Sequence, residues 1–173
     1  TLVNIIFISP LKRGQMSSRN GKTDTDMLTS RCRGALDGLY IGDALAMPVH
    51  WYYDREALRR DYGVVKDYAA PKNPHPDSIL WRSSYMPLNE KGEILHDQAQ
   101  YWGRRGIHYH QFLKAGENTL NLKLCTQLIE SLHEMGYYGP DDYLSRYVAF
   151  MTSPGTHRDT YVDHSTRILA IIG

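Results

Sequence analysis

A stripe of apolar side chains in the second half of the chain constrains the fold more than any other feature. These side chains recur every three or four positions over residues 118–135: Leu120, Leu124, Cys125, Leu128, Ile129 and Leu132. Residues with this spacing lie on one face of an α-helix. The stripe therefore predicts a helix that must bury this face, and Gly136 supplies a typical helix end.

Four further helices are predicted from capping residues and helix breakers. They cover residues 29–46, residues 54–62, a segment from Pro140 to the break at residues 153–155, and a last segment that begins near Asp159 or Thr160. Residues 64–106 are rich in Pro, Gly and Trp and are predicted to form a long loop, which in compact domains usually has a function. Strand signals are weak throughout, so the predicted fold class is all-α.

Charge and composition exclude several classes of protein. Lys and Arg number 20 against 19 Asp and Glu, so the chain lacks the basic excess of a protein that binds nucleic acid through bulk charge. No apolar stretch approaches the length of a membrane span, and we expect no membrane partner. The two cysteines, Cys32 and Cys125, cannot form a disulfide framework, which favours a reducing, cytoplasmic location.

The two ends of the chain differ from the rest. Residues 2–9 are apolar and precede Lys12 and Arg13, the reverse of the order in a signal peptide. We expect residues 1–27 to be a poorly ordered leader before a domain over residues 28–173, with Met16 or Met27 as the start; an edge strand over residues 3–8 is the alternative. Residues 166–173 (TRILAIIG) are apolar, which indicates that a missing C-terminal half or a partner chain covers them.

Three glycines follow one another along the first predicted helix. Gly34, Gly38 and Gly42 are four residues apart and share one face. A helical Gly costs about 1 kcal/mol relative to Ala, so their alignment indicates that another helix or a ligand approaches the backbone. Asp43 follows directly and is a candidate for binding a cation or a ligand hydroxyl, with an ordinary surface Asp as the alternative.

A turn of oxygen-bearing residues opens the Leu-rich helix. The side-chain oxygens of Glu117, Asn118 and Thr119 follow Gly116 and are of the kind that a hard cation prefers. Capping of the helix by Asn118 explains the same residues without a ligand.

The histidines suggest a different metal site. His108 and His110 are two residues apart and would point to the same side of an extended segment. With a distant His157 or His164 they could bind a transition metal, although a pair at this spacing is common without one.

Charged residues also gather where the last helix is predicted to begin. His157 and Arg158 precede that start, and helix N-termini attract anions such as phosphate. Asp159 and Asp163 would lie four residues apart on one face of this helix, where Asp163 and Arg167 could equally form an ordinary surface pair.

Three segments in order resemble the ADP-ribosylglycohydrolase family. Residues 34–50 (GALDGLYIGDALAMPVH) resemble its opening helix, which reads roughly GALLGAAIGDALGAPVEF. Residues 108–121 (HYHQFLKAGENTLN) and 152–167 (TSPGTHRDTYVDHSTR) are similar to pieces of the branch related to the J1 crystallins, in a family that also includes dinitrogenase-reductase-activating glycohydrolase. The resemblance covers residues 30–173 and corresponds to the N-terminal part of the family's domain.

This resemblance implies an all-α fold with a binuclear Mg²⁺ or Mn²⁺ centre. The family's Thr-Asp-Asp-Thr metal motif falls on residues 116–119, so Glu117, Asn118 and Thr119 are the expected metal ligands, although only Thr119 is identical. Many members have Glu where this chain has His50, and we expect His50 and Asp43 to be the catalytic residues beside the ribose. The family's further ligands lie in a C-terminal half that follows the matched segment, so these residues alone cannot complete the binuclear site.

Two functions follow from the resemblance. The first is metal-assisted hydrolysis of the glycosidic bond that links ADP-ribose to a protein side chain or a related group, with ADP-ribose or ADP-ribosylated protein as the partner. His157, Arg158 and Asp159 are then expected to bind the substrate at its diphosphate or adenine end. The second is a catalytically degenerate, crystallin-like protein with a binding or structural role, which the changed metal motif favours.

Overall fold

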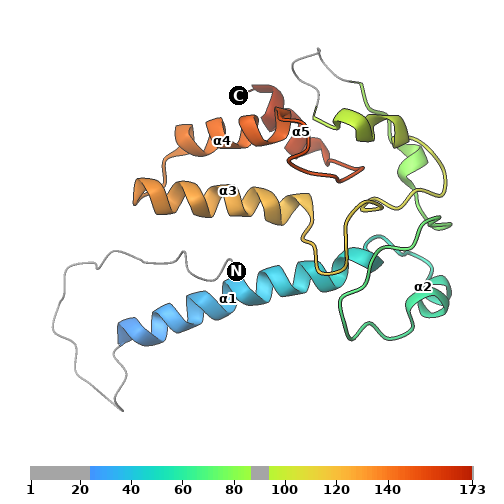
Figure 1. The fold of residues 1–173 in the computed structure, drawn as a ribbon, viewed down its shortest axis with the longest axis horizontal. Helices are drawn as coiled ribbons and strands as arrows, with labels where there is room; N and C mark the ends of the chain where they lie inside the picture. The colour runs from blue at the N-terminus through green and yellow to red at the C-terminus, as the bar shows by residue number, and fades with distance from the viewer. Residues whose placement is uncertain (1–23, 87–93, 173) are drawn as a thin grey trace.

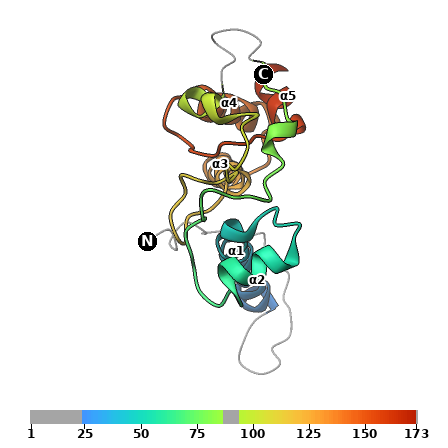
Figure 2. The same cartoon turned by 90° about the vertical axis from the view of Figure 1, so that its right-hand side faces the viewer.

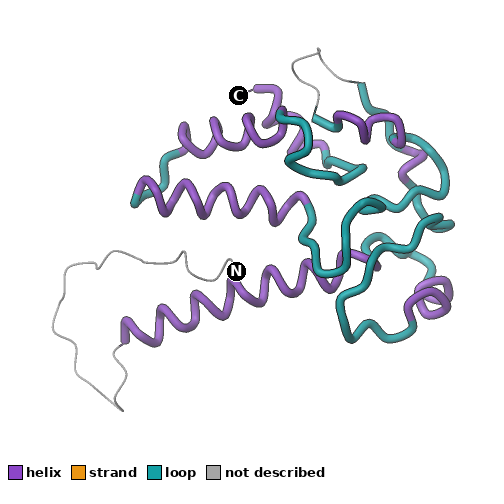
Figure 3. The backbone as a smooth tube through the Cα atoms, in the orientation of Figure 1, coloured by secondary structure: helices purple, strands orange, loops and turns teal. Residues whose placement is uncertain are grey.

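The computed structural model describes residues 24–86 and 94–172, and all regular structure in these ranges is helical (Figure 3). The all-α prediction is confirmed for this part of the chain. The elements are α1 (Asp24–Ala46), α2 (Arg55–Tyr62), α3 (Leu120–Met135), α4 (Pro140–Thr152) and α5 (His164–Ile172), with the 3-10 turns η1 (Met47–Val49), η2 (Leu80–Arg82) and η3 (His96–Tyr101). The predicted leader and its alternative edge strand fall mostly or wholly on residues 1–23, outside the described ranges.

Local signals placed the ends of the middle helices well. The Asp54 carboxylate accepts hydrogen bonds from the backbone N–H groups of Glu56 and Ala57 at 2.8 and 3.2 Å, and it caps α2 as expected. Gly136 ends α3 in the left-handed conformation, with φ of 73°. The long loop predicted over residues 64–106 contains only the short turns η2 and η3 within its described part.

Two predicted helix starts are wrong. Helix α1 begins at Asp24 rather than near Thr29, since Asp24 and Asp26 in its first turn suit the positive end of the helix dipole. Helix α5 begins at His164, because Asp163 caps it: the Asp163 carboxylate accepts hydrogen bonds from the backbone N–H of Thr166 at 3.0 Å and from its hydroxyl at 2.6 Å.

The core lies between the last three helices. Helices α3 and α4 lie side by side, and α5 packs against α4, as both views show (Figures 1 and 2). Loop residues complete this core, whose buried members are Ile94, Leu95, Leu120, Leu124, Tyr147, Met151, Val162 and Ala170. The apolar stripe of α3 is therefore buried in part against α4, as its periodicity requires.

Helix α1 is attached mainly at its C-terminal end, and it runs below α3 and diverges from it toward the N-terminal end of α1 (Figure 1). Ala44 is its only buried residue. A Cβ added at Gly34, Gly38 or Gly42 would meet nothing within 4 Å, so the described part of the chain supplies no neighbour for the glycine face. The close approach expected from these glycines is not found there. Among the described helices, none has the length and apolarity needed to cross a membrane.

Candidate functional site

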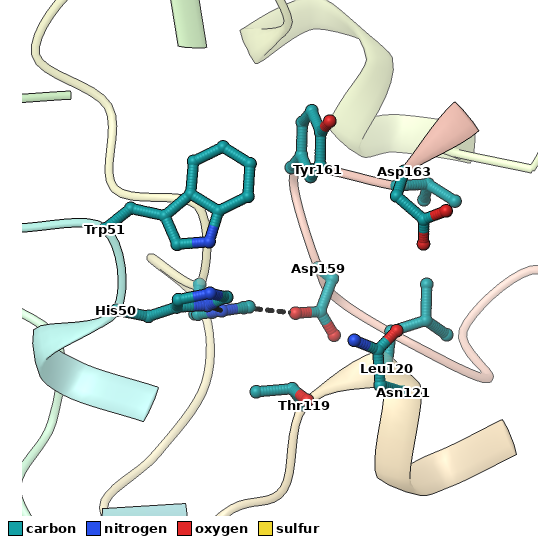
Figure 4. A pocket seen from close by; sticks show the side chains of 10 residues that line it. His50, Trp51, Thr119, Leu120, Asn121, Asp159, Tyr161 and Asp163 are labelled. Carbon is teal, nitrogen blue, oxygen red and sulfur yellow. Dashed lines mark hydrogen bonds and ion pairs between the residues drawn. The ribbon is translucent and has the colours of Figure 1, made fainter. Parts of the chain in front are cut away.

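A pocket of about 220 Å³ lies where three loops meet the N-terminal end of α3 (Figure 4). One loop follows η1, the second precedes α3 and the third precedes α5. The lining residues are His50, Trp51, His110, Thr119, Leu120, Asn121, Asp159, Tyr161, Val162 and Asp163. Three of the predicted site residues, His50, Thr119 and Asp159, thus meet in one cavity although they are far apart in the sequence.

Hydrogen bonds join three titratable side chains of this pocket. Nδ1 of His50 lies 2.7 Å from Nε2 of His110, and Nδ1 of His110 is hydrogen-bonded to Oδ1 of Asp159. The ring planes of the two histidines are within 13° of parallel. Burial, helped by the neighbouring His110, lowers the pKa of His50 to about 4, while Asp43 and Asp159 act in the opposite direction. His50 is therefore neutral at pH 7.

The second carboxylate oxygen of Asp159 is buried without a partner. Asp159 has 0% exposure, and its Oδ2 makes no hydrogen bond with any described residue. The backbone next to it is anchored, since the N–H of Thr160 donates to the carbonyl of Tyr109 at 2.9 Å. A buried acceptor without a donor is costly, and one at a pocket wall is suited to a ligand hydroxyl.

Aromatic rings form one side of the pocket. Trp51 has a φ of 66°, a left-handed conformation that is unfavourable for a non-glycine residue. Its indole packs against Tyr109 and Tyr161, with ring centroids 4.2 and 5.0 Å away. Figure 4 shows Trp51 and Tyr161 next to one another above Asp159, and their ring planes are tilted by 59°. These rings offer an apolar surface beside the polar group of His50 and Asp159.

Asp43 does not line the pocket but supports the turn below it. Its Oδ2 accepts hydrogen bonds from the side-chain amide of Asn118 at 2.9 Å and from the backbone N–H of Thr119 at 2.8 Å. Its Oδ1 accepts from the hydroxyl of Thr119 at 2.7 Å. Asn118 also donates to the carbonyl of Tyr40 at 2.7 Å. The structure therefore brings Asp43, Asn118 and Thr119 together, in a network that holds α1 to α3.

Glu117, the third residue of the expected metal corner, is held by cations. Its Oε1 accepts from Lys123 at 2.9 Å, and its Oε2 accepts from Arg158 at 2.8 Å and from the backbone N–H of Lys114 at 2.9 Å. Burial alone would raise the pKa of Glu117, but the hydrogen bonds from Lys114 and Lys123 and the charges of Lys123 and Arg158 outweigh it and lower the pKa.

The described residues do not fit the expected Mg²⁺ or Mn²⁺ centre in this arrangement. Both oxygens of Glu117 and both oxygens of Asp43 already accept hydrogen bonds. Nowhere in residues 24–86 and 94–172 do three or more His, Cys, Asp or Glu side chains converge in a way that could hold a metal ion.

The two-histidine metal hypothesis is also wrong for these residues. His108 and His110 lie at a turn rather than in an extended segment. Nε2 of His108 donates to the carbonyl of Pro48 at 3.1 Å, and its Nδ1 accepts from the backbone N–H of His110 at 3.0 Å. Burial and the nearby His110 and His75 lower the pKa of His108 to about 3. Both nitrogens of His108 are thus engaged within the protein.

The predicted anion site at a helix N-terminus is corrected by the start of α5. His157, Arg158 and Asp159 lie in the loop before that helix. Nε2 of His157 is hydrogen-bonded to the carbonyl of Ile94 at 2.7 Å, and the ring is buried. Arg158 is bound to Glu117 with a side chain 43% exposed, and only Asp159 reaches the pocket.

Sequence reasoning missed three parts of the pocket. Trp51 and Tyr161 were not singled out, although a Trp directly after a Pro-Val-His turn was a visible signal. The sequence points to His110 only as a metal ligand, because nothing in the local sequence relates it to Asp159 or His50.

Comparison with known proteins identifies the family. The model of the family described as ADP-ribosylglycohydrolase matches residues 24–170, which is most of the chain. No curated protein and no solved structure matches the chain significantly. Members of this family are generally metal-dependent and act on ADP-ribosylated substrates. The family match and the helical fold together show that the chain belongs to the ADP-ribosylglycohydrolase family.

Proposed function

We propose that this chain supplies the ribose-binding part of a hydrolase that cleaves the glycosidic bond between ADP-ribose and a protein side chain or related group. The buried Oδ2 of Asp159, unpaired among the described residues at the wall of a pocket that also contains His50, is the observation that carries the proposal. The pocket joins a hydroxyl acceptor, a neutral base and an aromatic wall.

The size of the pocket favours one sugar ring rather than a whole dinucleotide-like ligand. Sites for drug-sized ligands usually measure about 300–1,000 Å³, whereas this pocket measures about 220 Å³. A ribose would place a hydroxyl on Asp159 and its apolar face against Trp51 or Tyr161. The rest of ADP-ribose would then extend toward solvent, where the half-exposed guanidinium of Arg158 has further N–H groups for the diphosphate.

The proposed reaction adds water across the glycosidic bond. The bond between C1 of the ribose and the leaving atom breaks, and a bond between C1 and the water oxygen forms. Neutral His50 takes the proton from the attacking water, and protonated His50 then returns this proton to the leaving group. Positive charge develops on the ribose as the bond breaks, and the adjacent Asp159 carboxylate stabilises it.

Binding of ADP-ribose to pocket variants tests the proposal. Isothermal titration calorimetry is expected to show that Asp159→Asn weakens ADP-ribose binding by about 10-fold or more, which corresponds to the loss of a hydrogen bond to a charged group. Tyr137→Ala is the control, because Tyr137 is an exposed aromatic residue that does not line the pocket. Equal affinities for wild type and Asp159→Asn would refute this binding mode.

Catalysis is tested separately with an ADP-ribosylated peptide. His50→Gln is expected to retain ADP-ribose binding and to lose the release of ADP-ribose from the peptide. Binding without hydrolysis in the wild type would instead support the degenerate, crystallin-like alternative.

A further inference from the structure

We propose that His110 is a positioning residue that links Asp159 to His50 in a directed hydrogen-bond chain, so that Nε2 of His50 presents its lone pair to the pocket. This inference deepens the proposed function, on which its catalytic meaning rests, while the chain itself can be tested without any turnover. It assigns a role to a residue that neither the family match nor the sequence motif explains.

The three residues come from separate segments and are held close together. His110 is 60 residues from His50 and 49 residues from Asp159 along the chain. His110 is 6% exposed and Asp159 is fully buried, whereas His50 is partly exposed at the pocket. His110 therefore lies between a buried carboxylate and an imidazole that a ligand can reach.

The protonation of each ring follows from groups whose roles are fixed. An ionised carboxylate only accepts hydrogen bonds, so Nδ1 of His110 must carry the proton directed at Asp159. We take His110 as neutral, so that its other nitrogen, Nε2, is an acceptor. The bond to His50 consequently requires a proton on Nδ1 of His50. Nε2 of His50, which has no partner within the described ranges, is left as the basic atom.

The same reasoning gives His108 the opposite tautomer. The backbone N–H of His110 can only donate, so Nδ1 of His108 accepts; the carbonyl of Pro48 can only accept, so Nε2 of His108 carries the proton. His108 is thus an internal reference, two residues from His110, for any method that distinguishes the two ring nitrogens.

The chain also determines where a captured proton is stabilised. When Nε2 of His50 takes a proton, the Nδ1 proton of His50 can shift to His110, which places positive charge beside Asp159. The charged and titratable groups that act on His50 are His110, Asp43 and Asp159, and His108 lies close behind.

NMR of the ring nitrogens in the whole polypeptide tests the direction of the hydrogen bonds from His50 through His110 to Asp159. The expected result is a protonated Nδ1 in both His50 and His110 and a protonated Nε2 in His108. Assignment by the variants His50→Gln, His108→Gln and His110→Phe identifies the three signals. Protonation of His50 at Nε2 in the wild type would overturn the proposal, whether or not the protein hydrolyses any substrate.

Variants test whether the chain matters for the chemistry. His110→Phe keeps a ring of similar shape but removes both nitrogens, and it is expected to lower kcat by about 100-fold with little change in KM. His133→Phe makes the same exchange at an exposed position of α3 and is expected to keep the wild-type rate. If His110→Phe raises KM and leaves kcat unchanged, or if it leaves the tautomer of His50 unchanged, His110 has only a structural role.

Asp159→Asn provides a readout that does not depend on turnover. Removal of the negative charge is expected to lower the protonation midpoint of His50 by about one pH unit or more, because the charge of Asp159 favours protonated His50. An unchanged midpoint would refute the coupling. If the wild type shows the expected tautomers but hydrolyses no substrate, the hydrogen-bond chain is supported and the proposed function is refuted.

Discussion

Both carboxylate oxygens of Asp43 accept hydrogen bonds from one residue, Thr119. Oδ1 accepts from the Thr119 hydroxyl at 2.7 Å, and Oδ2 accepts from its backbone N–H at 2.8 Å. Thr119 precedes the first residue of α3, so its N–H is one of the groups that the helix itself leaves unpaired. Asp43 thus caps α3 from another helix and fixes the floor of the pocket.

Asp43→Ala is expected to destabilise the protein by about 2–3 kcal/mol, because it leaves the donors of Thr119 and Asn118 without their acceptor. Urea unfolding measures the difference. Asp37→Ala on the same helix is the matched control, since Asp37 is exposed, and it should change the free energy of unfolding little. Equal effects of the two substitutions would contradict the capping role.

Two glycines are expected to respond to Ala in opposite directions. Gly38→Ala should stabilise the protein by about 1 kcal/mol, because its Cβ meets open space on a regular helix. Gly136→Ala should destabilise it by about 1–2 kcal/mol, because its φ of 73° is unfavourable for an L-residue. Urea unfolding measures both changes. Destabilisation by Gly38→Ala would indicate that the glycine face of α1 has a partner after all.

Acid is expected to destabilise the fold from about pH 6.5 downward. Burial lowers the pKa of His50, His75, His108 and His157 below the ordinary value of 6.5, to about 4 for His50 and about 3 for His108. At a pH between the ordinary pKa of 6.5 and the lower pKa in the folded protein, the histidines of the unfolded chain bind protons that the folded protein excludes. The free energy of unfolding therefore falls as pH falls.

Each such histidine contributes up to about 1.4 kcal/mol per pH unit within its window. Urea unfolding at pH 7.5, 6.5 and 5.5 measures this loss, and His157→Phe should reduce its slope. Constant stability across these three pH values would show that the four rings are not held neutral.

Millimolar Mg²⁺ is expected to leave the thermal midpoint unchanged, because Lys123 and Arg158 already neutralise Glu117. A ligand raises the midpoint only if it binds the folded state preferentially. The double variant Lys123→Gln, Arg158→Gln removes both cations and is the form expected to gain a midpoint shift with Mg²⁺. A rise of the wild-type midpoint in differential scanning fluorimetry would disprove this account of Glu117.

The helices could be predicted largely from local patterns. The stripe that includes Leu120 and Leu124, the cap at Asp54 and the end at Gly136 act over three or four residues, so they are visible in the sequence. The start of α5 was predicted wrongly for a physical reason that also concerns helix capping. Asp159 and Asp163 are equally good caps by residue type, and the structure uses Asp163 because His110 binds Asp159 in the interior.

The sequence by itself determined the helical class, most helix ends and the family resemblance, because these depend on short-range periodicity and on residue order. Only the tertiary structure decided that His50, His110 and Asp159 form one chain and that Glu117 binds Lys123 and Arg158. Contacts between loops 49 and 60 residues apart leave no periodic trace in the sequence. They arise when packing of α3, α4 and α5, together with the hydrogen bonds from Asp43 of α1 to Thr119, brings the loops together and excludes water from their polar groups.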